Sequence, residues 1–111
     1  MTLFRSLAAI GAVALALTST VAVAADMENA KKKVTEVCQA CHGMDGNSPI
    51  AENPKLAGQH PDYLAKALRD YKSGARKNPI MAGFAQGLTD KDIENVAAYF
   101  STQPSVLATM H

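Results

Sequence analysis

Two cysteines and a histidine stand together in the run Cys38-Gln39-Ala40-Cys41-His42. This C-x-x-C-H pattern is typical of c-type haem attachment. Thiols three residues apart on one helical turn can reach the two vinyl groups at one edge of a porphyrin and form thioethers, and the next imidazole then lies beneath the iron. The chain has two cysteines in all, so neither is available for a further disulfide or metal site. The motif therefore predicts one covalently bound haem, with His42 as its first axial ligand.

The first 25 residues differ in composition from the rest of the chain. Arg5 supplies a positive charge, an apolar run extends from residue 7 to residue 17, and small residues follow it. This three-part pattern indicates a secretory signal peptide, because an apolar run of about 11 residues is shorter than the roughly 20 that a membrane-spanning helix needs. We expect cleavage after Ala24 or Ala25. The expected organisation is a signal peptide at 1–25 and one domain at 26–111.

The charge balance excludes one class of partner. The chain has 11 Lys and Arg residues against 10 Asp and Glu, and Arg5 leaves with the signal peptide, so the mature protein is close to neutral. A nucleic-acid-binding protein normally carries a strong basic excess, and we expect no nucleic-acid partner here. The chain has no Trp and only three Tyr and three Phe, so a covalently held macrocycle would supply apolar bulk that a small domain otherwise lacks.

The spacing of apolar residues and the capping signals predict three helices. The first is expected at 27–41, where apolar residues recur at intervals of three and four. The second is expected to begin at Pro61, since proline is favoured in a first turn, and to stop at Gly74. The third is expected to follow the N-cap Thr89, which is three residues from the capping-box residue Asp92.

The segments between these helices show no strand pattern. Residues 44–59 and 75–88 are rich in glycine, proline and asparagine and are therefore expected to be loops. The predicted fold class is all-α, with three main helices and two long loops.

A haem iron takes a second axial ligand from the opposite side of the ring. The candidates in the mature chain are the remaining methionine and histidine residues, namely Met27, Met44, His60, Met81, Met110 and His111. Met44 follows His42 too closely to cross the ring. Met27 and His60 lie at the starts of predicted helices, where surface positions are favoured. The last two candidates, Met110 and His111, lie in the terminal tail. Met81 lies between the second and third predicted helices, in a segment that can cover the open face. We therefore predict His42 and Met81 as the axial pair, which raises the reduction potential and leaves no open position for oxygen or a substrate.

These residues resemble the class I cytochromes c, in particular the small periplasmic cytochromes of bacteria. Besides the haem-attachment motif, the segment 53–59 looks like the family segment that follows that motif. The run Asn78-Pro79-Ile80-Met81 resembles the family's methionine-ligand loop, and Ala98-Tyr99-Phe100 resembles the end of its C-terminal helix. The resemblance covers nearly all of the mature chain.

The resemblance implies the cytochrome c fold, wrapped around one haem c that is bound through Cys38 and Cys41. It also implies that the carbonyl of Pro54 accepts a hydrogen bond from the imidazole of His42, which orients this ligand. Leu56 is implied to touch the ring.

The function implied is that of a single-electron carrier in the periplasm, and not of an enzyme. The expected partners are a redox donor and a redox acceptor, membrane-bound proteins included, with no small-molecule substrate, and the expected state is a monomer or a weak dimer. An alternative is a dedicated cytochrome subunit of a periplasmic dehydrogenase or oxidase. The basic residues of the second helix and just beyond it form either an ordinary solvated face or a docking surface for an acidic partner. These residues are Lys66, Arg69, Lys72, Arg76 and Lys77.

Other classes of protein use parts of the same motif. A thiol–disulfide oxidoreductase would use Cys38 and Cys41, but its motif begins a helix after a strand. A zinc site would draw on these cysteines with His42 and His60, at spacings that structural zinc sites do not use. A haem enzyme or gas sensor would need an open sixth position.

Overall fold

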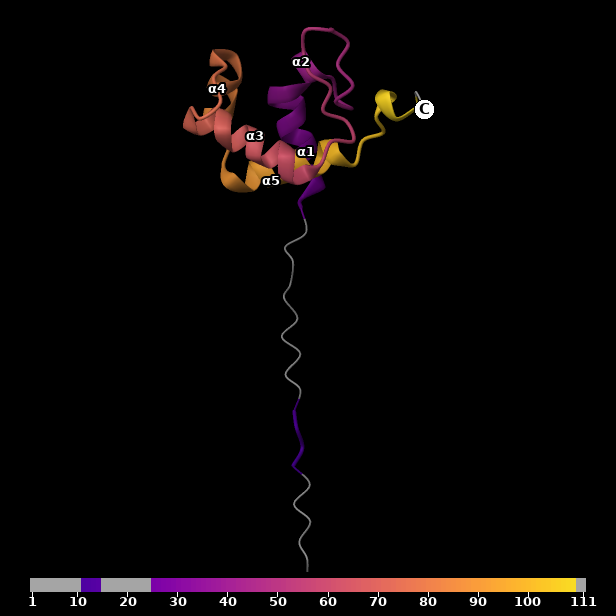
Figure 1. Ribbon diagram of the computed structural model, residues 1–111, viewed down its shortest axis with the longest axis vertical. Helices are drawn as coiled ribbons and strands as arrows, with labels where there is room; N and C mark the ends of the chain where they lie inside the picture. The colour runs from indigo at the N-terminus through magenta and orange to yellow at the C-terminus, as the bar shows by residue number, and fades with distance from the viewer. Residues whose placement is uncertain (1–10, 15–24, 110–111) are drawn as a thin grey trace, which may run out of the picture.

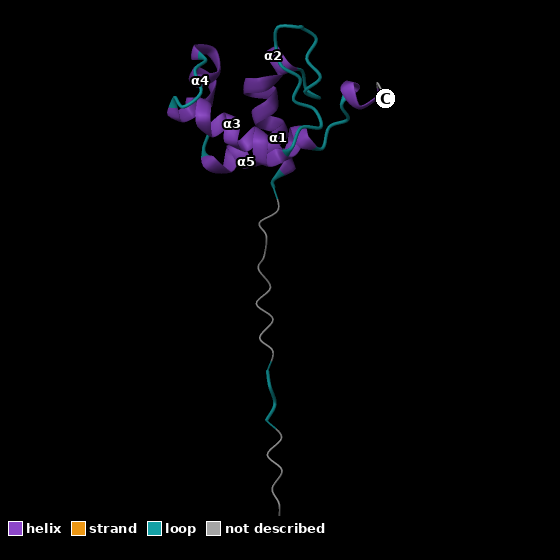
Figure 2. Ribbon diagram, viewed as in Figure 1, coloured by secondary structure: helices purple, strands orange, loops and turns teal. Residues whose placement is uncertain are grey.

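The computed structural model describes residues 11–14 and 25–109, so most of the signal peptide expected at 1–25 lies outside the described residues. Figure 2 shows that the described part is built from helices and loops and has no strand, which confirms the all-α class. No helix among the described residues is long and apolar enough to cross a bilayer. The elements are α1 (Met27–Lys33), the π-helix η1 (Val34–Cys38), α2 (Gln39–His42), α3 (Pro61–Ser73), α4 (Pro79–Gln86), α5 (Asp90–Ser101) and the 3-10 helix η2 (Val106–Thr109).

The first predicted helix is present and continuous, but it is not α-helical throughout. Asp26 caps α1 by accepting a hydrogen bond from the backbone N–H of Asn29 at 3.0 Å. The five residues of η1 then form a π-helical turn that ends at Cys38, the first residue of the haem-attachment motif. Gly43 ends the helical stretch with a φ of 79°.

The second predicted helix begins and ends as expected, and the third begins as expected. Pro61 occupies the first turn of α3, and Gly74 follows its end in the left-handed conformation. Thr89 and Asp92 form a complete capping box at α5, in which the Thr89 hydroxyl accepts from the Asp92 N–H at 3.1 Å and the Asp92 carboxylate accepts from the Thr89 N–H at 3.0 Å.

The expectation of a loop throughout 75–88 is wrong, because α4 lies within it. Asn78 caps this helix, since its side-chain oxygen accepts from the backbone N–H groups of Ile80 and Met81, both at 3.1 Å. Pro79 follows at the first helical position, where its fixed φ favours the helix and its missing N–H costs nothing. Met81 therefore lies on a short helix rather than in a loop.

The core lies where α1 and α3 pack against α5 (Figure 1). Phe100 and Tyr99 of α5 meet edge to face, with ring centroids 5.4 Å apart. The Tyr99 hydroxyl donates to the carbonyl of Met44 at 2.8 Å, which ties the loop after α2 to α5. The buried members of this core are Ala30, Val34, Leu64, Ala65, Leu88, Ile93, Val96, Ala97, Tyr99 and Phe100.

Candidate functional site

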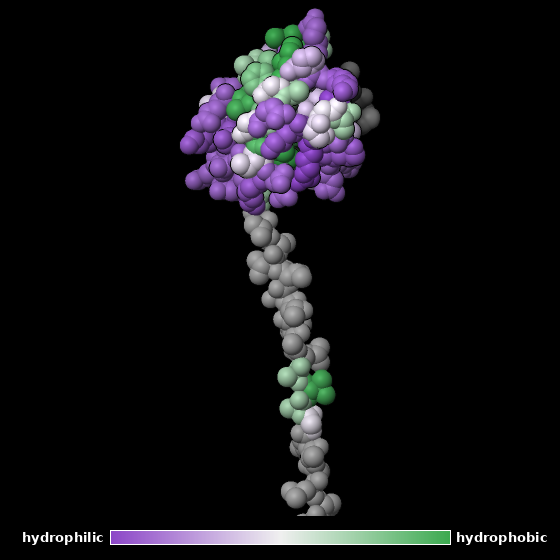
Figure 3. All heavy atoms as spheres, turned by 90° about the vertical axis from the view of Figure 1, so that its left-hand side faces the viewer, coloured by the Kyte–Doolittle hydropathy of each residue, from purple (hydrophilic) through white to green (hydrophobic). Residues whose placement is uncertain are grey.

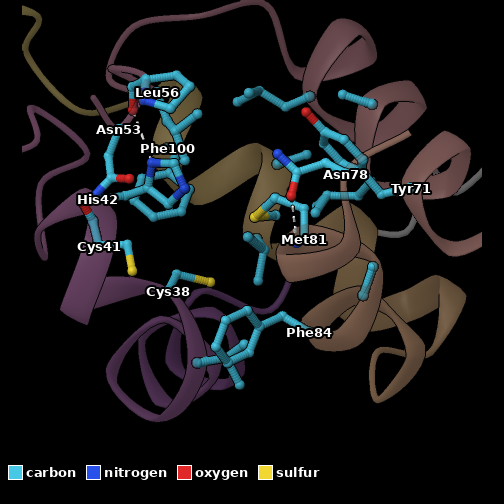
Figure 4. Close-up of a pocket in the computed structure, with 18 of the residues that line it drawn as sticks. Cys38, Cys41, His42, Asn53, Leu56, Tyr71, Asn78, Met81, Phe84 and Phe100 are labelled. Atoms are coloured by element: carbon cyan, nitrogen blue, oxygen red, sulfur yellow. Dashed lines mark hydrogen bonds between the residues drawn. The ribbon is translucent and has the colours of Figure 1, made fainter. Parts of the chain in front are cut away.

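A cavity of about 280 Å³ opens between α2, the loop 43–59, α3, α4 and α5. All six residues that the sequence predicts for the haem site line it, so the fold brings together positions that are far apart in the chain. These residues are Cys38, Cys41, His42, Pro54, Leu56 and Met81. Figure 4 shows that the two cysteines and His42 lie on one side of the open space, and that Met81 faces them from the other.

The contacts of His42 determine the orientation of its imidazole and which ring nitrogen donates a hydrogen bond. His42 is 7% exposed, and its Nδ1 lies 2.8 Å from the carbonyl oxygen of Pro54. A carbonyl oxygen can only accept a hydrogen bond, so Nδ1 carries a proton, and in the neutral tautomer with this proton the other nitrogen, Nε2, has the free lone pair. A hydrogen bond of this kind orients a metal-binding histidine and raises its basicity. The structure thus contains the contact between Pro54 and His42 that the sequence led us to expect.

The two thiols are the next chemical feature of the same wall. The structure contains Cys38 and Cys41 as free cysteines, both half-buried. Burial raises the pKa of the Cys38 thiol to about 11, so this thiol is protonated at neutral pH. The Cys41 carbonyl accepts from the side-chain amide of Asn53 at 3.0 Å and from the hydroxyl of Ser48 at 3.2 Å. These bonds hold the motif against the loop that carries Pro54.

A tight turn at Gly46 shapes that loop. Its carbonyl accepts from the backbone N–H groups of Leu56 at 2.7 Å and Ala57 at 3.1 Å, which closes the loop around Pro54. Gly46 has a φ of 74°, and a Cβ placed on it would lie 2.7 Å from a ring carbon of Phe100 and 2.9 Å from the nitrogen of Ala57. Both the conformation and the close approach require glycine here.

The wall opposite His42 comes from α4 and the end of α3. The sulfur of Met81 points into the open space, and Tyr71 and Asn78 lie beside it (Figure 4). Asn78 caps α4 and so fixes the turn from which Met81 projects. Arg76 also lines the cavity, and its guanidinium carbon lies 4.7 Å from the centroid of the Tyr71 ring. Arg76 and Asn78 were not predicted to line the cavity, because the sequence pattern indicates a surface charge at Arg76 and a loop position at Asn78.

Several of the basic side chains that were candidates for a docking surface have partners within the chain. Lys66 pairs with Asp70, and Arg69 pairs with Glu94 at 3.3 Å. Lys72 is half-buried, and its Nζ donates to the backbone carbonyl of Leu88. The five charges therefore do not form one uniform basic face.

The mouth of the cavity is instead apolar. Ile80 is 69% exposed and Phe84 is 46% exposed, although both also line the cavity. Figure 3 looks onto the α4 side of the molecule and shows apolar side chains gathered amid hydrophilic surroundings. An exposed apolar patch with a polar rim is typical of a binding site.

The arrangement does not favour the zinc or thiol–disulfide alternatives. Within residues 11–14 and 25–109, no three His, Cys, Asp or Glu side chains gather into a group that could hold a metal ion. His60 is exposed before the first turn of α3 and does not line the cavity. Cys38 and Cys41 lie near the end of a helical stretch and follow no strand in the described part.

The donor set fits a covalently attached haem. Two free thiols, an imidazole and a thioether sulfur face one largely apolar cavity, and together they could supply two attachment points and two iron ligands. Nothing else in the described part of the chain combines these groups.

Comparison with known proteins gives the same answer. The sequence model of the cytochrome c family matches residues 27–104. Cytochrome c4 of Stutzerimonas stutzeri is 46% identical over 98 residues, which cover 80% of this chain and 46% of that protein. The cytochrome subunit of sulfide dehydrogenase from Chlorobaculum tepidum is 41% identical over 63 residues, 57% of this chain and 56% of that one.

A solved structure agrees with the fold. The crystal structure of reduced recombinant cytochrome c4 from Pseudomonas stutzeri superposes with a TM-score of 0.67 at 46% identity, over 74% of this chain and 47% of that one. The chain spans about half the length of the cytochromes c4 that it matches. The chain belongs to the cytochrome c family, and its cofactor is a covalently bound haem c.

Proposed function

We propose that the domain at 26–111 is a periplasmic carrier of single electrons. Cys38 and Cys41 hold the haem, and His42 and Met81 are its two axial ligands. The observation that carries this proposal is the placement of an oriented imidazole and a thioether sulfur on opposite sides of one apolar cavity. The signal pattern at 1–25 supports export, since it has the three parts that secretion requires.

The role of His42 follows from its contacts. The Pro54 carbonyl holds the proton on Nδ1, so Nε2 stays available to the iron. The loop that carries Pro54 is in turn fixed by Gly46 and by the bonds to the Cys41 carbonyl. The imidazole therefore has one orientation, and the chain rearranges little when the charge at the site changes.

Met81 sets the chemistry of the opposite side. Its thioether is a soft ligand that favours the reduced iron and so raises the reduction potential. When bound, the haem supplies one-electron exchange at its iron. With both axial positions filled by His42 and Met81, no position remains for a substrate, which supports a carrier rather than an enzyme.

The partners are redox proteins, one donor and one acceptor. The apolar mouth formed by Ile80 and Phe84 suits small and transient contacts of the kind that electron-transfer proteins use. We expect a monomer or a weak dimer, with no nucleic-acid partner and no small-molecule substrate.

The test is to purify the exported protein and measure three properties of it. The intact mass should equal the chain from residue 25 or 26 plus one haem, and the haem should remain attached after denaturation. A redox titration should show a single one-electron transition. In Met81→Ala the potential should fall and carbon monoxide should bind the reduced protein. A wild-type protein that binds carbon monoxide as readily as this variant would refute the carrier proposal.

A second candidate is a dedicated subunit of a periplasmic dehydrogenase. The relative that favours it is the cytochrome subunit of sulfide dehydrogenase from Chlorobaculum tepidum. A subunit would co-purify with a larger protein at a fixed ratio, whereas a free carrier would be isolated alone. Size-exclusion chromatography of the native periplasmic extract, followed by its haem absorption, separates the two.

A further inference from the structure

The end of α3 and the end of α4 are joined by two reciprocal hydrogen bonds. The Nζ of Lys72, in α3, donates to the carbonyl of Leu88, just beyond α4, at 2.5 Å. The side-chain amide of Gln86, the last residue of α4, donates to the carbonyl of Lys72 at 2.7 Å. We refer to these two bonds as the Lys72 clamp.

Burial of apolar surface holds α4 only weakly. Within this helix Ala85 is buried, whereas Ile80 and Phe84 are exposed and Met81 is half-buried. A helix of eight residues is too short to be stable without tertiary contacts. The position of α4 therefore depends on what fixes its two ends.

Both ends of α4 are attached to the same end of α3. At the start, residues 74–78 form a short connection from α3, and Asn78 caps the new helix. At the other end, the Lys72 clamp returns the chain to α3. Figure 1 shows α4 over one end of α3. Met81 is the third residue of α4 and so lies between the two attachments.

We propose that Lys72 is a positioning residue for the Met81 ligand. Its ammonium group acts through the Leu88 carbonyl and keeps α4 closed over the cavity, and it is not a docking charge. The inference rests on the proposed function, because it assigns to Lys72 the task of keeping the Met81 sulfur at the iron.

Three observations separate this role from that of a surface charge. Lys72 is half-buried, while Lys77 is exposed. The ammonium donates to a backbone carbonyl outside a helix, which no other lysine of α3 does. The carbonyl of Lys72 is one of the last four of α3, which lack helical partners, and Gln86 satisfies it.

The experiment compares Lys72→Met with Lys77→Met in the haem-loaded protein. Methionine keeps the apolar stem of the lysine and removes its charge and its donor. Lys77→Met removes an equal charge five positions away, and no hydrogen bond or ion pair involves the Lys77 side chain in the described part of the chain. The readouts are imidazole binding to the oxidised protein, which reports displacement of Met81, and the reduction potential.

Loss of a hydrogen bond from a charged donor changes an opening equilibrium by about tenfold. We expect Lys72→Met to bind imidazole about tenfold more tightly than wild type and to have a lower potential. Lys77→Met should remain within about twofold of wild type. Lys72→Arg keeps a donor and should restore the wild-type affinity. If Lys72→Met does not accumulate as a haem protein, Gln86→Leu removes the other bond of the Lys72 clamp and should also tighten imidazole binding.

The results that overturn the inference are distinct from those that overturn the proposed function. If Lys72→Met and Lys77→Met bind imidazole with equal affinity, the hydrogen bond of Lys72 does not hold Met81 in place. If Lys72→Arg binds imidazole as tightly as Lys72→Met does, a hydrogen-bond donor at this position does not hold Met81 in place either. A wild-type protein without methionine ligation would overturn both this inference and the axial pair of the proposed function, before any variant is compared.

Discussion

Substitution of Gly46 by alanine tests how the loop 43–59 positions the site. Two costs add at this residue. A φ of 74° costs an L-residue about 1–2 kcal/mol. A new Cβ would also lie 2.7 Å from a ring carbon of Phe100 and 2.9 Å from the nitrogen of Ala57, and overpacking of this kind costs about 1–3 kcal/mol. Neither neighbour can move easily, because Phe100 is 1% exposed and the Ala57 N–H is hydrogen-bonded to the carbonyl of Gly46.

The chain offers a matched control at Gly74. This residue also has a positive φ, 85°, but a Cβ there would meet nothing within 4 Å. Gly74→Ala should therefore cost only the conformational term, about 1–2 kcal/mol. Gly46→Ala should cost about 2–5 kcal/mol in total, so the two variants should differ by about 1–3 kcal/mol.

The assay is equilibrium unfolding in urea, followed by helical circular dichroism, on wild type and both variants. With an m-value of about 1–3 kcal/mol per molar, the difference between the variants corresponds to about 1 M in the unfolding midpoint. Equal midpoints in Gly46→Ala and Gly74→Ala would refute the claim that Phe100 and Ala57 leave no room at Gly46.

Three further predictions concern the caps, α4 and the buried thiol. Thr89→Ala should lower the free energy of unfolding by about 1 kcal/mol, because it removes the acceptor for the Asp92 N–H; an unchanged urea midpoint would contradict this. Gly83→Ala should raise it by about 0.5–1 kcal/mol, because the site is open and helical, and a lower midpoint would contradict the helix. In haem-free protein the raised Cys38 pKa stabilises the fold fully below about pH 9, and this contribution is lost as the pH rises towards about 11. Iodoacetamide at pH 8 should accordingly alkylate Cys38 far more slowly in folded than in urea-unfolded protein, as mapped by mass spectrometry, and equal rates would contradict the burial.

The sequence was enough to predict the helices whose ends are marked by capping residues. Pro61, Gly74 and the pair Thr89 and Asp92 are caps that act within one turn, so their chemistry is visible in the sequence and appears in the structure. The gathering of the six candidate haem-site residues around one cavity was also predictable, because the C-x-x-C-H motif and the family resemblance point to these positions.

The helix α4 was missed although its cap is equally local. Asn78-Pro79 is a turn signal in many contexts, and it becomes a helix start only when the following residues continue the helix. The residues after it are apolar, but Ala85 alone among residues 80–86 is buried, so the segment shows no stripe of buried positions. The sequence therefore shows the cap that begins α4 but lacks the periodic buried positions that usually indicate the rest of a helix.

The hydrogen bond of Lys72 could not be predicted from the sequence, for a different reason. Its partner, the carbonyl of Leu88, is 16 residues away and is a backbone group, which leaves no trace in residue type. The π-helical turn at Val34–Cys38 is likewise a matter of backbone hydrogen bonding, and the spacing of apolar residues fits an α-helix equally well.

The central claim is that the haem is held between His42 and Met81. Proton NMR of the reduced protein tests it most directly, because the methyl group of an axial methionine lies over the ring and its resonance is shifted far upfield by the ring current. The account predicts one such methyl resonance in wild type and its loss in Met81→Ala. A spectrum without this resonance, or one that keeps it in Met81→Ala, would contradict the account.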